Sequence, residues 1–204
     1  LALSLFGNYN TSCTGVHDGS LNATISGGTT PFTYTWSGPN GFSSNVEDIA
    51  NLAPGAYTVN IVDANGCTAS ANATLTAPQP LDATITTSTS SSGHAIACHG
   101  ATGSINLNIT GGNQPWAISW NGPNGFTAST ANITDLLAGT YTASITDANG
   151  CSASEQVTLT EPDPLIATGV VGDFNGTGLS CADASDGSID LTVSGGAGGN
   201  TFIW

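Results

Sequence analysis

Apolar and polar residues alternate in short runs along the chain, which is the pattern of half-buried β-strands. Residues 21–25 and 32–36 alternate in this way, residues 57–61 do the same, and a fourth run extends from about 67 to 75. Turn signals such as Gly-Gly, Pro-Asn-Gly and Asn-Gly separate these runs. No segment shows a sustained helical period, so the pattern predicts an all-β protein.

The pattern recurs along the chain with a period of 84 residues. The recurring anchors include Gly27, Gly111 and Gly195; Trp36, Trp120 and Trp204; Tyr57 and Tyr141; and Cys67 and Cys151. A fixed period over many anchors indicates an array of modules, and this period suits a small domain with its own core.

Pro-x-Pro pairs at 78–80 and 162–164 mark the predicted module boundaries. The first module is expected over 1–80 with its first strand truncated, the second over 81–164, and the N-terminal half of a third over 165–204. About seven short strands per module, separated by frequent turns, are typical of a two-sheet sandwich. The predicted fold class is all-β, with tandem Ig-like antiparallel β-sandwich modules of about 84 residues.

Four aromatic residues are predicted to be structural. Trp36 and Trp120 stand on the apolar face of their strands, and we expect both in the sandwich core. Tyr57 and Tyr141 follow a Gly turn at the start of the next-to-last strand. This position resembles a tyrosine corner, in which the hydroxyl bonds back to the backbone.

The charge balance excludes several classes of partner. Lys and Arg are absent, while Asp and Glu number 14, so the net charge is −14. Without cationic side chains the protein is not expected to bind nucleic acid or anionic lipid. No stretch is apolar enough to insert into a membrane as a helix.

The chain contains five cysteines, and the simplest prediction gives one disulfide bond to each module. Cys13 precedes Cys67 by 54 residues and Cys98 precedes Cys151 by 53, so these two pairs are expected, with the partner of Cys181 outside the fragment. Zinc is disfavoured because closely spaced Cys pairs are missing. Disulfides predict a secreted protein at the extracellular cell surface.

Catalysis and cofactors find no support in the sequence. The histidines His17, His94 and His99 do not recur between modules, and no nucleophile motif accompanies them. We therefore expect a protein that is not an enzyme and needs no cofactor.

Calcium is the one ligand with candidate oxygen donors. The residues concerned are Asp63 and Asn65, Asp147 and Asn149, and Asp173 and Asn175. The competing interpretation is a tight turn in which Asp bonds its own backbone. A calcium loop starting at Asp173 would also need Glu at position 184, which is Ala184.

Phe42 and Phe126 occupy matching Pro-Asn-Gly-Phe loops and are candidates for a glycan contact. The alternative is that each ring packs under its own loop, because large apolar side chains are usually buried.

Several motifs together resemble the SprB-type repeat of large Bacteroidota surface proteins, which include gliding-motility adhesins. They are Cys13 with Gly19, the runs 27–36, 52–59 and 63–67, and the closing Glu161-Pro162. The resemblance implies an adhesive or filamentous role and export by type IX secretion.

The predicted function is a non-catalytic stalk or fibre within an extracellular adhesin. Its expected partners are further copies of the same module in the same chain, with lateral or filament self-assembly as an extension. The alternative is a polysaccharide-binding array or the accessory region of a larger secreted enzyme.

Overall fold

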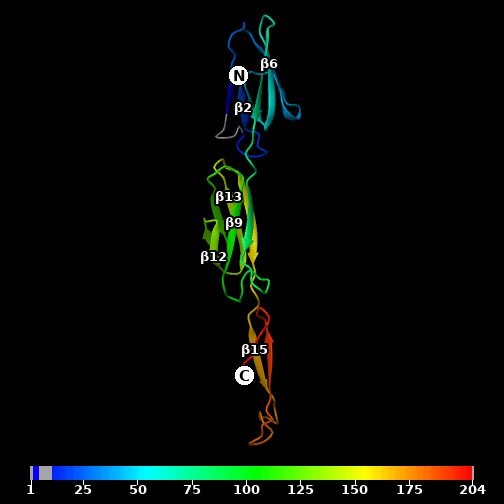
Figure 1. Ribbon diagram of the computed structural model, residues 1–204, viewed down its shortest axis with the longest axis vertical. Coiled ribbons are helices and arrows are strands. Elements are labelled where there is room, and N and C mark those ends of the chain that lie inside the picture. Colours follow the sequence, from blue (N-terminus) through cyan, green and yellow to red (C-terminus); the bar gives the residue numbers. More distant parts are fainter. Residues whose placement is uncertain (1, 5–10, 204) are drawn as a thin grey trace. The chain divides into compact units, whose positions relative to one another are not determined.

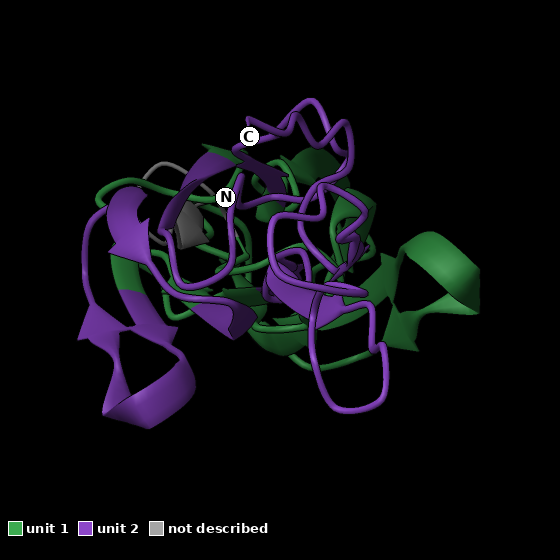
Figure 2. Ribbon diagram, turned by 90° about the horizontal axis from the view of Figure 1, so that it is seen from below, with its two compact units in different colours: residues 1–83, 109–118, 144–154 green, residues 84–108, 119–143, 155–204 purple. Residues whose placement is uncertain are grey.

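A computed structural model describes residues 2–4 and 11–203 of the chain (Figure 1). Trp204, the third member of the recurring Trp set, lies outside the described residues. The chain divides into two compact units (Figure 2). Unit 1 comprises residues 1–83, 109–118 and 144–154, and unit 2 comprises residues 84–108, 119–143 and 155–204.

Two antiparallel sheets form the first part of the chain. One has the order β1-β2-β5 and the other the order β4-β3-β6-β7. The strands are β1 (Ala2–Ser4), β2 (Gly19–Asn22), β3 (Thr33–Ser37), β4 (Ser43–Ser44), β5 (Ile49–Leu52), β6 (Gly55–Val62) and β7 (Thr68–Leu75). A short 3-10 helix, η1 (Pro39–Gly41), connects β3 to β4.

The core of this part lies between the two sheets. Leu21 comes from β2 and Ile49 from β5, while Trp36 and Tyr57 come from the opposite sheet, and all four belong to one buried cluster. In the register of the second sheet Trp36 is paired with Val59, which is also buried. Period-two alternation thus places one face of each sheet in a shared core, as in an Ig-like sandwich.

Seven strands from residue 82 to residue 159 repeat this arrangement, with sheet orders β12-β9-β8 and β11-β10-β13-β14. They are β8 (Asp82–Thr87), β9 (Gly103–Thr110), β10 (Ala117–Asn121), β11 (Thr127–Ala128), β12 (Asn132–Leu136), β13 (Gly139–Thr146) and β14 (Ser152–Leu159), with the 3-10 helix η2 (Pro123–Gly125) after β10. The sequence prediction of an all-β, antiparallel, Ig-like fold is confirmed.

Residues 165–203 form a single hairpin of β15 (Ile166–Val171) and β16 (Ile189–Ser194). The side chains of Ile189 and Leu191 are 57% and 38% exposed. Their sequence counterparts Ile105 and Leu107 are only 0% and 5% exposed, because there a second sheet covers them. The alternating pattern is therefore enough to form the strands. Burial of their apolar side chains additionally requires a second sheet that covers them.

The two Trp side chains occupy equivalent positions. Trp36 is 1% exposed and Trp120 is 0% exposed. Each indole Nε1–H donates a 3.0 Å hydrogen bond to a backbone carbonyl ten residues further on, that of Val46 or Thr130. A large ring with its polar atom satisfied stabilises the core without an unpaired donor.

Replacing Trp120 with Ala should lower the free energy of unfolding by about 3–5 kcal/mol, because the substitution empties a core site. Denaturant unfolding of the variant measures the loss. The exposed neighbour provides the control, since Ser119→Ala should change the free energy of unfolding by less than about 0.5 kcal/mol. A loss below about 1 kcal/mol for Trp120→Ala would contradict its place in the core.

Candidate functional site: the joint between successive repeats

A short linker and a pair of glycines form the first part of the joint, which lies within unit 1. The backbone N–H of Gly112 donates to the carbonyl of Gln79 at 3.0 Å. Gly111 has a φ of +67°, and a Cβ at this position would collide with the carbonyl oxygen of Pro80. Glycine is therefore required twice, for the left-handed backbone and for the close approach of the linker.

The joint recurs at the next linker, within unit 2. The backbone N–H of Gly196 donates to the carbonyl of Asp163 at 2.8 Å, and a Cβ on Gly195 would collide with the carbonyl oxygen of Pro164. At the matching position in the first repeat, a Cβ on Gly27 would meet nothing within 4 Å. In the second and third repeats, the Gly-Gly pair thus packs against the linker that connects its repeat to the previous one.

A disulfide bond is the second part of the joint. Cys13 is bonded to Cys151, with a Cα–Cα distance of 5.8 Å and a sequence separation of 138 residues. Beside it, the Asn149 side-chain amide donates to the carbonyl of Ser12 at 3.0 Å. The first two repeats are therefore connected twice, once by the linker and once by the disulfide.

This pairing corrects the predicted bonds Cys13–Cys67 and Cys98–Cys151. In the structure Cys67, Cys98 and Cys181 are free and exposed. The prediction assumed that the two cysteines of one repeat bond to each other. The observed bond instead joins a cysteine of the first repeat to a cysteine of the second.

The geometry of β7 explains why the predicted bond does not form. The loop of Cys13 is held at the end of β7, where Thr11 N donates to the carbonyl of Thr76 and Thr14 Oγ1 donates to that of Pro78. Cys67 lies immediately before the start of β7, which is 8 residues long. A strand of this length separates its ends by roughly 26 Å, while disulfide-bonded Cα atoms lie within about 7 Å.

The predicted bond between Cys98 and Cys151 does not form either. The loop of Cys98 is held by the hydrogen bond from Ile96 N to the carbonyl of Thr160. Cys151 is bonded to Cys13 instead, and Cys98 is free.

The turn that carries Cys151 is built around one carboxylate. Asp147 Oδ1 accepts hydrogen bonds from the backbone N–H groups of Asn149 at 2.9 Å and Cys151 at 2.8 Å. Its Oδ2 accepts from the N–H of Asn113 at 2.8 Å. These bonds fix the position of the Cys151 backbone.

The matching turn in the first repeat uses Asp63 in the same way. Its carboxylate accepts from the backbone N–H groups of Cys67 at 2.8 Å, Asn65 at 2.9 Å and Thr29 at 3.1 Å. The hydrogen bond from Cys67, followed by that from Thr29, holds the pKa of Asp63 below its ordinary value. Asp63 and Asn65, which are calcium candidates, thus form a tight turn in which Asp63 bonds the backbone. Calcium binding stays a prediction.

The third calcium candidate also lies in a tight turn. The backbone N–H of Gly176 donates to Asp173 Oδ1, and Phe174 and Thr177 exchange two backbone hydrogen bonds around Asn175, which has a φ of +53°. Within residues 2–4 and 11–203, no cluster of three or more His, Cys, Asp or Glu side chains is arranged to hold a metal ion.

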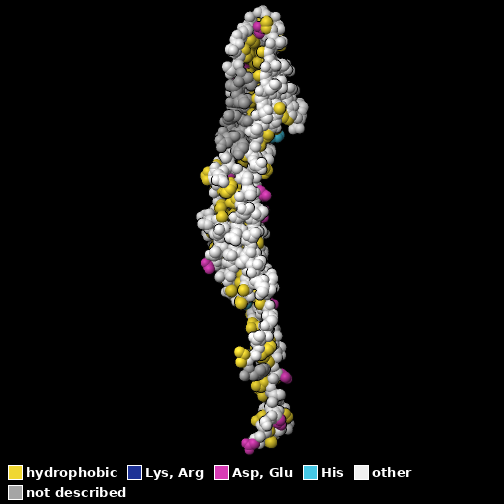
Figure 3. All heavy atoms as spheres, in the orientation of Figure 1, with side chains coloured by type: hydrophobic (Ala, Val, Ile, Leu, Met, Phe, Trp, Pro, Cys, Tyr) yellow, Lys and Arg dark blue, Asp and Glu magenta, His cyan; other side chains and the backbone are white. Residues whose placement is uncertain are grey.

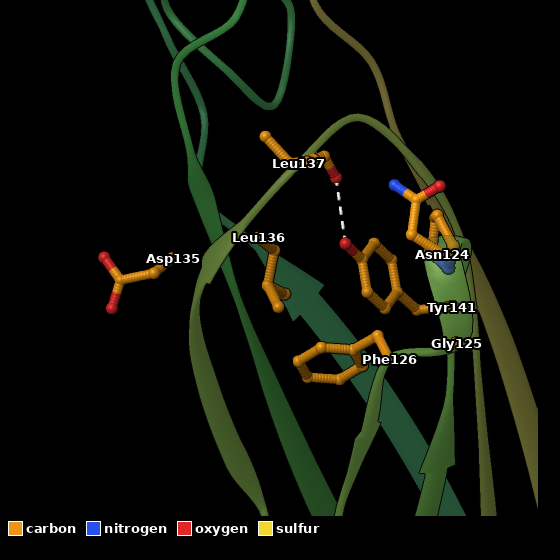
Figure 4. A pocket seen from close by; sticks show the side chains of 8 residues that line it. Asn124, Gly125, Phe126, Asp135, Leu136, Leu137 and Tyr141 are labelled. Carbon is orange, nitrogen blue, oxygen red and sulfur yellow. Dashed lines mark hydrogen bonds between the residues drawn. The ribbon is translucent and has the colours of Figure 1, made fainter.

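Each Pro-Asn-Gly-Phe loop packs against a tyrosine, and Figure 4 shows the loop of Phe126 with Tyr141. The Phe126 ring meets the Tyr141 ring edge-on at a centroid distance of 5.4 Å, and the Tyr141 hydroxyl donates to the carbonyl of Leu137 at 3.0 Å. Phe42 and Tyr57 repeat the ring contact at 5.5 Å, with the Tyr57 hydroxyl bonded to the carbonyl of Ala53 at 2.9 Å.

A shallow depression remains beside Phe126. It is lined by the loop and by Asp135, Leu136 and Leu137 from the neighbouring segment (Figure 4). Both Phe rings are half-buried, so each already contributes part of its surface to its tyrosine. Glycan contact by Phe42 or Phe126 stays a prediction.

The face shown in Figure 3 carries its negative charges singly rather than in patches. Asp and Glu side chains are scattered over the face shown in Figure 3. No helix in the described part of the chain has the length and hydropathy to cross a membrane.

The family comparison agrees with the repeat pattern. The SprB repeat family model matches three segments, residues 9–41, 96–125 and 174–204. These three segments are therefore similar to SprB repeats. Among curated proteins, none matches the chain significantly.

Solved structures similar to this chain include Ig-domain molecules of low sequence identity. The amphioxus IgVJ-C2 molecule is 15% identical, with 72% of this chain and 98% of that chain covered and a TM-score of 0.36. The N-terminal four Ig domains of Dscam1 isoform 1.9 are 17% identical, with 73% and 42% covered and a TM-score of 0.34. The N-terminal eight Ig domains of Down Syndrome Cell Adhesion Molecule isoform 1.30.30 are 16% identical, with 79% and 26% covered and a TM-score of 0.36.

The two matching glycines provide a test of the joint. Gly27→Ala should cost about 1–2 kcal/mol, because its φ of +79° disfavours a side chain. Gly111→Ala should cost about 1–3 kcal/mol more, because its Cβ also collides with Pro80. Denaturant unfolding of the two variants compares the losses, and equal losses would contradict the close approach of the linker.

The Asp63 turn predicts a pH dependence. A pKa lowered in the folded state means that the carboxylate stabilises the fold above its ordinary pKa of 3.8, and that this stabilisation is lost as the pH falls through the lower folded value. NMR titration should place the Asp63 midpoint below 3.8. Asp63→Asn should weaken the fall in stability on acidification, and a midpoint at or above 3.8 would refute the hydrogen-bonded turn.

Proposed function

We propose that this chain is a non-catalytic, load-bearing repeat region of a secreted cell-surface adhesin. The bond between Cys13 and Cys151 carries the proposal, because it connects successive repeats. The SprB repeat matches support the cell-surface assignment. An oxidising extracellular environment is where such a bond persists.

The disulfide changes the path that a pulling force takes through the chain. Tension applied at the two ends passes from Cys13 directly to Cys151 and bypasses the residues between them. Those residues include every strand from β2 to β13. Most of the first two repeats can therefore lose their hydrogen bonds without adding length to the stalk.

Three further features support a spacer rather than a binding module. The linker at Gln79 is seated on Gly112, so little free tether remains at the joint. The Phe42 ring packs edge-on against Tyr57, and the Phe126 ring packs in the same way against Tyr141. The net charge of −14 opposes collapse of repeats onto one another at low salt. Export by type IX secretion and a part in gliding motility belong to this proposal through the SprB resemblance.

Pulling single molecules by their ends tests the load path. The oxidised chain should extend roughly 450–500 Å less than Cys13→Ser, since 138 residues stay inside the closed loop. Cys98→Ser is the matched control, because Cys98 is free and its loss should leave the extension unchanged. Equal final extensions for the oxidised chain and Cys13→Ser would overturn the proposed load path.

A further inference from the structure

Two kinds of cysteine form the joint disulfide: one lies in a turn, the turn half, and the other lies in a loop, the loop half. The chain contains five such cysteines but one disulfide. Cys151 belongs to the turn half, and its sequence counterpart is Cys67. Cys13 belongs to the loop half, and its counterparts are Cys98 and Cys181. Only Cys13 and Cys151 are bonded, while the other three are free and exposed.

The Cys67 turn has the same backbone hydrogen bonds as the bonded turn. Asp63 N donates to the carbonyl of Cys67 at 2.9 Å, as Asp147 N does to that of Cys151 at 2.9 Å. The Asp63 Oδ1 bonds to the turn also match those of Asp147 to within 0.1 Å. The turn half is therefore formed in the absence of a partner, which reduces the ordering that bond formation requires.

The contacts around Cys67 differ from those around Cys151. The side-chain amide of Asn65 donates to Thr29 Oγ1 at 3.0 Å, whereas that of Asn149 donates across the joint to Ser12. The space next to Gly27 is open, whereas the linker fills it at Gly111. Among the described residues, no other repeat contacts Asn65 or Gly27.

The Cys181 loop is built like the bonded Cys13 loop. Ser12 N donates to Asp18 Oδ1 at 3.0 Å, and Ser180 N donates to Asp186 Oδ1 at 3.2 Å. A backbone bond closes each loop, from Val16 to the carbonyl of Cys13 at 3.3 Å and from Ala184 to that of Cys181 at 3.2 Å. The loop half is therefore also preformed.

We propose that Cys67 is a disulfide acceptor for the cysteine loop of another SprB repeat, and that Cys181 is such a loop. Between two copies of this chain, the bond would join Cys181 of one copy to Cys67 of the other. Because the two surfaces differ, the contact is head-to-tail and does not close on itself, so it produces linear multimers.

The reaction is an oxidation of two thiols. The thiolate of one cysteine attacks a low-molecular-weight disulfide such as oxidised glutathione, forming a mixed disulfide and releasing one glutathione thiol. The second cysteine then displaces the other glutathione. One protein disulfide replaces one glutathione disulfide, and two protons are transferred with the two electrons.

The inference rests on the proposed function as a repeat array, but its test is independent. The pulling experiment concerns the bond between Cys13 and Cys151 within one chain. Oxidation of the free cysteines concerns bonds between chains, so either result can fail without the other.

The test incubates the whole chain at high concentration with oxidised and reduced glutathione, followed by non-reducing electrophoresis and mass spectrometry of the linked peptides. Multimers joined from Cys67 to a loop cysteine, chiefly Cys181, are expected. Cys67→Ser and Cys181→Ser should each lose the Cys67–Cys181 bond, and Cys98→Ser should retain it.

Asn65→Ala separates the joint from indiscriminate thiol coupling. It keeps Cys67 but removes the amide that corresponds to Asn149, so the yield of Cys67–Cys181 bonds should fall about tenfold. The rate at which Cys67 reacts with a small aromatic disulfide should stay unchanged. Like-to-like bonds such as Cys67–Cys67, or monomers carrying glutathione on Cys67, would overturn the proposal.

Discussion

The bond between Cys13 and Cys151 is the constraint on which the rest of the joint depends. It holds the Ser12 carbonyl against the Asn149 amide, and it stands beside the linker that enters over Gly111. A short covalent linker alone leaves its neighbours free to rotate about backbone torsions. The disulfide is a second covalent connection beside the linker. It removes most of that rotational freedom, because any rotation must satisfy the linker and the disulfide at once.

The absence of Lys and Arg shapes how the chain satisfies its carboxylates. Backbone N–H groups take the place of cationic side chains, and both Asp63 and Asp147 accept three of them. The His99–Glu161 contact at 3.1 Å is an ion pair only when His99 is protonated. Stability therefore comes from apolar burial, turn hydrogen bonds and the disulfide rather than from salt bridges.

Much of the fold follows from local pattern, because period two determines which side chains share a sheet face. Spacing alone places Leu21, Trp36 and Tyr57 on the apolar faces of their strands, and these faces meet in one core. The disulfide partner could not be placed in this way, because the period shows which cysteines are equivalent but not which end of a strand each occupies. The fold supplies that information, because Cys67 precedes β7 and the Cys13 loop is hydrogen-bonded at the other end of this strand.

Disulfide mapping of the oxidised chain tests the joint most directly. Trypsin cannot be used on a chain without Lys or Arg, but cleavage before Asp separates Cys13, Cys67, Cys98 and Cys151 onto different peptides. With free thiols blocked before digestion, mass spectrometry should find the Cys13 peptide bonded to the Cys151 peptide, and Cys67 and Cys98 in blocked form. Recovery of Cys13–Cys67 together with Cys98–Cys151 would contradict a covalent bond between successive repeats.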